Sequence, residues 1–280
     1  MKIGIYPGCS LTGTARDYNE SVFALANAFG IDFAQIPDWN CCGATAAHNL
    51  NEELALSLPT RIMALAEQSG IEEVVVPCAA CYSRLVVTQS HLKNNPEQKN
   101  RIAKVIEMDY KGSLKILNVI EWIGKYILPN IDEKIINPFA HKVACYYGCL
   151  LVRPQKILKY DRAEDPQTMD VVMNKIGAIA IEYPFKTECC GAGFSISRTD
   201  IVSKLSGKII EDAESRGAEA IIVACPMCHS NLDMRRGSIN EYWNKKFKIP
   251  VIFVTQAIGC AIGLPASKIG FKRHFVEVNI

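Results

Sequence analysis

Short apolar runs alternate along the whole chain with longer segments that have helical periodicity, such as residues 52–68 and 201–216. Each apolar run has the length and the β-branched content of a buried strand. Strands that alternate with helices are typical of βα units built around a mostly parallel sheet. The predicted strands are residues 2–6, 32–36, 73–76, 115–119, 142–146, 178–183, 220–224 and 251–254.

The most apolar stretch, residues 249–266, approaches the length of a membrane span. It contains Thr255 and Gln256, and turn-forming Gly and Pro residues lie near its end, so we expect a buried strand that runs into a helix. The first twenty residues have no apolar run of signal-peptide length. We therefore expect a cytoplasmic protein without a direct membrane span.

The chain contains an internal repeat, which tests each motif twice. IGIYPGCSLTGTAR (residues 3–16) aligns with VACYYGCLLVRPQK (143–156), and WNCCGATAA (39–47) aligns with ECCGAGFSI (188–196). IEEVVVPCAACYSRL (71–85) aligns with AEAIIVACPMCHSNL (218–232). The repeat predicts an α/β protein with two pseudo-symmetric, Rossmann-like βα halves, residues 1–137 and 138–280.

Cysteine dominates the matched positions. Each half has one Cys, then CysCysGly, then a CxxC pair, and each motif follows a predicted strand. Because the carboxyl ends of parallel strands meet at one edge of a sheet, the five thiols of a half can reach one site. The matched cysteines are Cys9, Cys41, Cys42, Cys78 and Cys81 in the first half and Cys149, Cys189, Cys190, Cys225 and Cys228 in the second.

Five thiols per site favour an iron–sulfur cluster. A CxxC pair alone also occurs in redox dithiols and in zinc sites. Structural zinc takes four ligands, so a fifth thiolate exceeds its needs, although a zinc site in one or both halves stays open. Free cysteine is also a small, often buried hydrophobe, which explains one or two cysteines but not two matched sets.

The repeat also separates candidate ligands from other residues. Cys145 is opposite Ile5, and Cys260 is opposite Lys125, so we expect both to be packing residues. His48 and His229 lie close to cysteine motifs, but neither has a counterpart, and we do not expect them to be ligands. His91, His141 and His274 are expected at the surface. Five arginines follow cysteine motifs and are candidates for binding an anionic substrate tail, although solvated surface is the expectation for each: Arg84, Arg153, Arg198, Arg235 and Arg236.

Composition narrows the functional classes. Thirty-one Lys and Arg against twenty-nine Asp and Glu give a net charge of +2, which does not indicate nucleic acid or an anionic membrane as a partner. The charged share of 21% and the hydrophobic share of 49% are those of an ordinary globular protein. Twelve cysteines in a chain expected in a reducing compartment favour metal ligation over disulfides.

The two motif sets YPGCSLTGTAR, CCGATAA, CAAC and YYGCLLVRP, CCGAGF, CPMC resemble the CCG-domain iron–sulfur proteins, in the arrangement of the B subunit of heterodisulfide reductase. The resemblance spans nearly the whole chain. It implies two noncubane 4Fe–4S clusters, each held by the five matched cysteines of one half. It also implies reductive cleavage of the mixed disulfide of coenzyme M and coenzyme B between the clusters.

The resemblance further implies partners that supply electrons. They are the iron–sulfur (C) and flavin-containing (A) subunits of heterodisulfide reductase, with a hydrogenase or formate dehydrogenase module behind them. The chain itself has no ferredoxin-type CxxCxxCxxxCP run and no GxGxxG fingerprint.

Two alternatives remain open from the sequence. One is a CCG subunit that relays electrons in another oxidoreductase, of the lactate, glycolate or succinate type. The other is a zinc-stabilised assembly module without a redox role.

Overall fold

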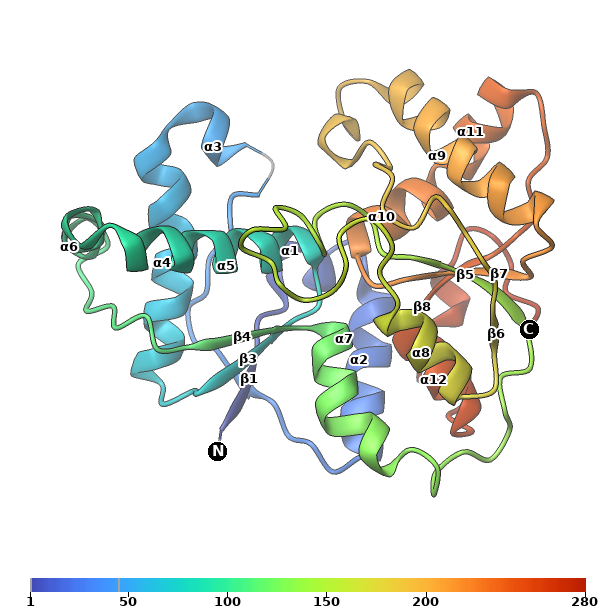
Figure 1. The fold of residues 1–280 in the computed structure, drawn as a ribbon, viewed down its shortest axis with the longest axis horizontal. Coiled ribbons are helices and arrows are strands. Elements are labelled where there is room, and N and C mark those ends of the chain that lie inside the picture. The colour runs from blue at the N-terminus through green and yellow to red at the C-terminus, as the bar shows by residue number, and fades with distance from the viewer. Residues whose placement is uncertain (1, 45) are drawn as a thin grey trace.

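Each half of the chain forms a four-stranded, all-parallel sheet, and the two sheets lie side by side in the computed structural model, which describes residues 2–44 and 46–280 (Figure 1). The first sheet has the order β2-β1-β3-β4 and the second the order β6-β5-β7-β8. The matching order confirms the predicted α/β fold with two similar halves. The strands are β1 (Ile3–Ile5), β2 (Ala34–Gln35), β3 (Glu73–Val76), β4 (Lys115–Asn118), β5 (Lys142–Tyr146), β6 (Ile179–Ala180), β7 (Ala220–Val223) and β8 (Val251–Phe253).

Helices connect consecutive strands in both halves. The first half has α1 (Gly8–Thr12), α2 (Arg16–Ala28), α3 (Ala47–Leu50), α4 (Glu52–Gln68), α5 (Ala79–Asn94), α6 (Pro96–Val105) and α7 (Val119–Trp122), then a π-helical turn η1 (Ile123–Ile127) and a 3₁₀ turn η2 (Leu128–Asn130). The second half has α8 (Thr168–Lys175), η3 (Ala192–Phe194), α9 (Thr199–Ser215), α10 (Pro226–His229), the π-helical η4 (Ser230–Met234), α11 (Arg236–Trp243), α12 (Val254–Ala261) and η5 (Phe271–Arg273).

The central strands are buried on both faces, which explains their continuous apolar runs. All residues of β3 and β7 are buried. The edge strands β2 and β6, which pair with β1 and β5, are two residues long and thus shorter than the predicted ranges 32–36 and 178–183. Each edge segment is followed by a proline, Pro37 or Pro184, which has no N–H to extend the ladder.

The apolar stretch 249–266 forms β8 and α12, as the sequence predicts. Nearly all residues of both elements are buried. Among the residues that the structure describes, no helix combines the length and the apolar character that crossing a membrane requires.

Helix α2 joins the two halves by packing against α12. The Tyr18 ring stacks on Phe253 with ring centroids 3.9 Å apart, and the Tyr18 hydroxyl donates to the Ala224 carbonyl at 3.3 Å. Next to them, the hydroxyls of Ser21 and Thr255 hydrogen-bond at 2.7 Å. These buried contacts fix the orientation of the first sheet relative to the second. The exact boundary at residues 137 and 138 stays a prediction.

The contact between α9 and α11 gives a test of this packing. A Cβ atom at Gly207 would lie 2.0 Å from Nε1 of Trp243, whereas Gly237, also helical, has nothing within 4 Å. We expect Gly207→Ala to lower the free energy of unfolding by about 1–3 kcal/mol, the usual cost of overpacking. Gly237→Ala is the matched control, and it should leave stability unchanged or raise it by up to about 1 kcal/mol. Denaturant titration of both variants measures the difference, and equal midpoints would contradict the packing described.

Candidate functional site

Every cysteine motif of the first half lies at the carboxyl end of a strand. Cys9 is in α1, directly after β1, and Cys41 and Cys42 are in the loop after β2. Cys78 is the N-cap of α5, and Cys81 lies in its first turn. The second half repeats this placement with Cys149 after β5, Cys189 and Cys190 after β6, and Cys225 and Cys228 around the start of α10.

The thiols of each half come close together. The sulfur atoms of Cys42 and Cys81 are 3.1 Å apart, and those of Cys190 and Cys228 are 3.7 Å apart. In both halves the CxxC pair and the second Cys of CysCysGly are buried, while Cys9, Cys41 and Cys189 are exposed and Cys149 is half-buried. Each set therefore has a buried inner side and an outer side that faces solvent.

A tyrosine at the end of the first strand positions each CysCysGly loop. The Tyr6 hydroxyl donates to the carbonyl of Asn40 at 2.8 Å, and the Tyr146 hydroxyl donates to the carbonyl of Glu188 at 2.6 Å. Asn40 and Glu188 each precede the first Cys of the loop. The motif analysis did not single out these tyrosines, although the repeat places Tyr6 opposite Tyr146 and could have identified them.

The second CysCysGly loop has additional polar supports. The Asn231 amide and the Ser206 hydroxyl both donate to the Cys190 carbonyl, at 3.0 and 3.1 Å. Ser195 in turn hydrogen-bonds Asn231 at 2.8 Å. These side chains hold the buried Cys190 thiol in place, and the sequence patterns gave no signal for them.

Glycine is required where the backbone approaches the sulfur atoms. Gly8 and Gly148 have φ angles of +60° and +69°. A Cβ atom there would lie 3.4 Å from the Cys81 sulfur and 2.9 Å from the Cys228 sulfur, respectively. Glycine adopts this left-handed conformation without steric cost, and its missing Cβ leaves space beside the thiols.

The two cysteine sets meet at the contact between the halves. Cys78 and Cys225 lie close together across it, and each thiol shifts the pKa of the other. A cavity of about 210 Å³ opens beside them. It is lined by all five matched cysteines of the first half and, from the second half, by Ser195, Pro226, Met227 and Ser230.

Thiols this close cannot ionise independently. Hydrogen bonds from Cys41 and Cys81 lower the pKa of Cys42 to about 4, and a hydrogen bond from Cys149 lowers that of Cys189 to about 6. Conversely, hydrogen bonding to Cys190 and Cys225 raises the pKa of Cys228 well above its usual value. Each thiolate is thus stabilised by a neighbour that keeps its proton, and ionising all five would require cations among them.

An iron–sulfur cluster fits these residues. Thiolates are its usual protein ligands, and bound iron supplies the positive charge that lets neighbouring thiols ionise together. The absence of a Cβ at Gly8 and Gly148 leaves room beside the buried sulfurs.

The unmatched cysteines lie elsewhere. Cys145 is fully buried within β5, where Asp170 and Lys186 are its charged neighbours. Cys260 lies on α12, half-buried. Neither lines the cavity. That Cys145 and Cys260 are packing residues and not metal ligands stays a prediction.

The structure corrects two expectations of surface exposure. The His274 side chain is 0% exposed, because the C-terminal segment turns it inward beside Asp17. Arg236 is also buried, and its guanidinium donates to the carbonyls of Leu232 and Ile249 at 3.1 and 2.9 Å. Periodicity does not reveal either arrangement, since both depend on contacts distant in sequence.

Two of the other arginines support the cavity walls. Arg84 donates to the Ala44 carbonyl at 3.4 Å and contacts Nδ1 of His48 at 2.9 Å, and Arg235 donates to the Ser195 carbonyl. Ala44 and Ser195 both line the cavity. Arg153 and Arg198 instead form exposed ion pairs with Glu164 and Asp200.

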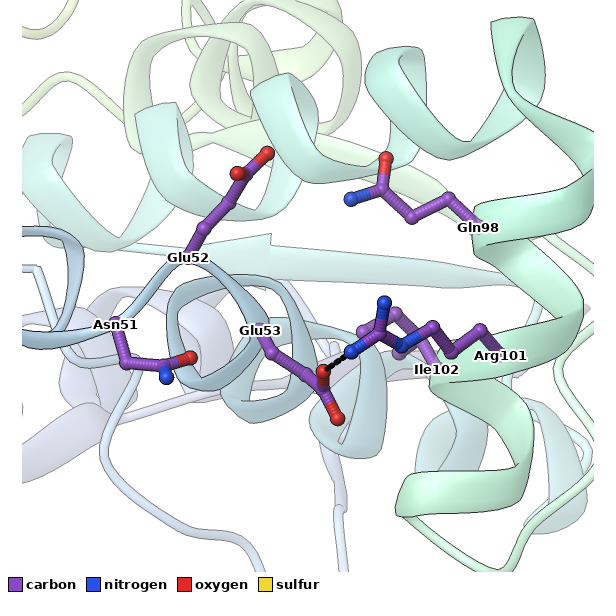
Figure 2. Close-up of a pocket in the computed structure, with 6 residues that line it drawn as sticks. All are labelled: Asn51, Glu52, Glu53, Gln98, Arg101 and Ile102. Atoms are coloured by element: carbon purple, nitrogen blue, oxygen red, sulfur yellow. Dashed lines mark hydrogen bonds and ion pairs between the residues drawn. The ribbon is translucent and has the colours of Figure 1, made fainter.

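A separate pocket lies between the start of α4 and α6 (Figure 2). Five of its six lining residues are polar or charged, and Arg101 forms an ion pair with Glu53 across it. The pocket contains no cysteine, and we assign it no part in the chemistry of the cysteine sets.

Comparison with known proteins identifies the class. The CCG cysteine-rich domain model matches residues 3–86 and 143–233, one copy in each half, so the chain belongs to the CCG cysteine-rich family. A Wolinella succinogenes relative, the membrane anchor subunit of 8-methylmenaquinol:fumarate reductase, is 26% identical, with 99% of this chain and 98% of the relative covered. A Methanosarcina acetivorans relative, the B subunit of Ferredoxin/F(420)H(2)-dependent CoB-CoM heterodisulfide reductase, is 27% identical, with 99% and 94% covered.

A solved structure shares the fold. A hypothetical protein from Helicobacter pylori superposes with a TM-score of 0.81 at 14% identity, and the match covers 99% of this chain and 52% of that one. This likeness concerns the fold alone. Family membership and the thiol sites together support iron–sulfur clusters as the cofactor, and they place the protein among the oxidoreductase subunits.

The glycine beside Cys228 gives a test of the site. Gly148→Ala places a methyl group 2.9 Å from the Cys228 sulfur at a φ of +69°, so we expect it to lower the iron content of anaerobically purified protein. Gly193→Ala is the control, because a Cβ atom at Gly193 meets nothing within 4 Å. Iron and acid-labile sulfide per chain are the measurement. Full iron loading of Gly148→Ala would show that this close approach is not needed.

Proposed function

We propose that the chain is the catalytic subunit of a heterodisulfide reductase complex and that it holds two noncubane 4Fe–4S clusters. Cys9, Cys41, Cys42, Cys78 and Cys81 would hold one cluster, and Cys149, Cys189, Cys190, Cys225 and Cys228 the other. The observation that carries this proposal is the meeting of two five-thiol sets at one contact, where Cys78 and Cys225 lie close enough to shift each other's pKa.

The proposed reaction is reductive cleavage of a mixed disulfide of the coenzyme M–coenzyme B type. One disulfide, two electrons and two protons give two thiols, and iron–sulfur clusters supply one-electron redox chemistry and soft-ligand affinity for sulfur. Two adjacent one-electron centres match the two electrons that the bond requires. The protein contributes binding, orientation and exclusion of water.

The cavity at the contact is the proposed entrance for the disulfide. The wall residues Pro226 and Met227 offer apolar contacts, and a thioether is a favourable neighbour for a sulfur-containing substrate. Of the five arginines that follow cysteine motifs, Arg84 and Arg235 donate to carbonyls of the cavity wall and are the best placed to attract an anionic substrate tail.

The electron supply would come from partners. The iron–sulfur (C) and flavin-containing (A) subunits of heterodisulfide reductase, with a hydrogenase or formate dehydrogenase module, are the proposed donors. The exposed side of the cysteine sets, at Cys9, Cys41 and Cys189, allows close approach of such a partner.

A second function has support from the Wolinella relative, which belongs to a fumarate reductase and matches at nearly the same identity. In that case the chain relays electrons within a respiratory oxidoreductase and binds no disulfide. The two functions share the clusters and differ in whether the cavity takes a substrate.

Anaerobic turnover separates the two functions. We expect cluster-loaded protein to cleave the coenzyme M–coenzyme B disulfide with reduced viologen as the donor, and both thiol products can be quantified. Cys42→Ser and Cys190→Ser should each lower the rate by at least about tenfold, since each removes a buried cluster thiolate. Cys260→Ala, which changes a cysteine away from the cavity, is the control and should keep the rate.

Intact, cluster-loaded protein that takes up electrons from viologen but forms no thiol would favour the relay function. Protein without visible iron–sulfur absorption after anaerobic purification would contradict both functions and leave the zinc-stabilised assembly module.

The ligand assignment has its own test. Cys81→Ser and Cys228→Ser should each lose up to about half of the bound iron, because each disturbs one of the two sites. Cys145→Ala and Cys260→Ala should keep all of it. Iron analysis and electron paramagnetic resonance of the four variants measure this. Loss of about half the iron in Cys145→Ala or Cys260→Ala would mean that the repeat does not separate ligands from packing residues.

A further inference from the structure

One position of the internal repeat carries different side chains in the two halves. It is the third residue after the second Cys of each CxxC pair, Arg84 in the first half and Asn231 in the second. Both side chains reach the CysCysGly loop of their own half. Arg84 donates to the Ala44 carbonyl at 3.4 Å, and Asn231 donates to the Cys190 carbonyl at 3.0 Å. The same place in the fold thus carries a cation in one half and a neutral amide in the other.

The neighbours of Asn231 determine how its buried amide group is oriented. The end that faces the Cys190 carbonyl must be the nitrogen, because a carbonyl oxygen only accepts. The amide oxygen then faces the Ser195 hydroxyl, which donates to it at 2.8 Å. An amide nitrogen has two hydrogens, and the Cys190 sulfur, 3.7 Å from the nitrogen, accepts the second. Asn231 therefore donates directly to a cysteine sulfur.

This donor is specific to the second half. Asn231 lies in the π-helical turn η4, whereas Arg84 lies in the α-helix α5. Such π-helical turns are rare and are frequent at functional sites. Counted from the CysCysGly motif, Ser195 is opposite Ala47, which has no hydroxyl. The first half therefore cannot form the same pair of side chains.

In the first half, Arg84 acts through its charge. The side chain is half-buried and contacts Nδ1 of His48 at 2.9 Å. The pKa of the Cys42 thiol is lowered chiefly by hydrogen bonds from Cys41 and Cys81, and the Arg84 charge lowers it further. The positive charge thus favours negative charge on the Cys42 sulfur.

Hydrogen bonds to the ligand sulfurs are among the features that set the reduction potential of an iron–sulfur cluster. Reduction adds negative charge, part of which resides on those sulfurs. An N–H donor or a nearby cation stabilises the added charge, so each raises the potential at which the cluster accepts an electron.

We propose that the side chain at this repeat position tunes the reduction potential of the cluster in its own half, Asn231 by donating to the Cys190 sulfur and Arg84 by its charge near Cys42. Ser195 contributes by orienting the Asn231 amide. Asn231 and Arg84 act through the cysteines and are positioning residues. The inference rests on the proposed placement of one cluster in each cysteine set, and it does not depend on the identity of the substrate.

Potentiometric titration of the cluster-loaded protein, under anaerobic conditions and without a disulfide, tests the Asn231 assignment. Visible absorption and electron paramagnetic resonance follow the reduction, and Cys190→Ser shows which midpoint potential belongs to the second half. Asn231→Leu keeps the side-chain size but removes the donor. At a fixed potential it should lower the reduced-to-oxidised ratio of the second centre about threefold to tenfold, where tenfold is about 59 mV for a one-electron centre. The first centre should keep its midpoint.

Two further substitutions extend the test. Ser195→Ala leaves the Asn231 amide without its anchor, so it should shift the second midpoint in the same direction but less, and it gives the comparison if Asn231→Leu loses iron. Arg84→Gln removes the charge and should lower the midpoint of the first centre alone. Arg84→Lys keeps the charge and should restore most of that shift.

Ser206→Ala is the matched control. It removes the other donor to the Cys190 carbonyl, at 3.1 Å, and leaves the donor to the sulfur, so both midpoints should stay unchanged. An equal shift in Ser206→Ala and Asn231→Leu would show that loop position sets the potential, and it would overturn the proposal. Unchanged midpoints in Ser195→Ala and Arg84→Gln with full iron would overturn it too.

The outcomes also separate this inference from the proposed function. Protein without two clusters would contradict the cofactor placement and this inference together. Loaded protein that cleaves no disulfide but shows the expected shifts would contradict the proposed reaction alone. Loaded protein that cleaves the disulfide and shows no shifts would contradict this inference alone.

Discussion

Mutual repulsion of crowded thiolates is the constraint on which the structure depends. Five thiols on one side of a sheet can share protons pairwise, as Cys42 does with Cys41 and Cys81, but they cannot all ionise without added positive charge. The fold brings them together nonetheless, because parallel strands end at one edge and a cysteine motif follows three of the four strands in each half. The fold thus crowds thiols that can ionise together only beside added positive charge, and bound iron supplies that charge.

The duplication of this arrangement gives the molecule its central feature. Each half supplies a complete set of cysteines, and the packing of α2 on α12 through Tyr18 and Phe253 places the two sets against each other. The first-half cavity draws its opposite wall, including Met227, from the second half. A chemistry that needs two centres at once therefore depends on the contact between halves as much as on the ligands.

Much of this could be predicted from the sequence. The strands and the two similar sheets follow from buried apolar runs, and the internal repeat identified the cysteines that the structure brings together. The repeat could not predict the contact of Cys78 with Cys225, because alignment relates the halves without docking them. The inward turn of His274 likewise depends on a segment after the last repeated motif, where the sequence has no counterpart to compare.

The contrast between exposed and buried sulfurs has a consequence for maturation and damage. Cys9, Cys41 and Cys189 face solvent, whereas both CxxC pairs are buried. A cluster that an assembly factor delivers to the folded chain meets the outer thiols first. It then has to exchange the ligands of that factor for the inner thiols. Oxygen and peroxide approach from the same side. The thiols that receive a cluster are thus also the first to be oxidised when it is lost, so repair and inactivation compete at the same three sulfur atoms.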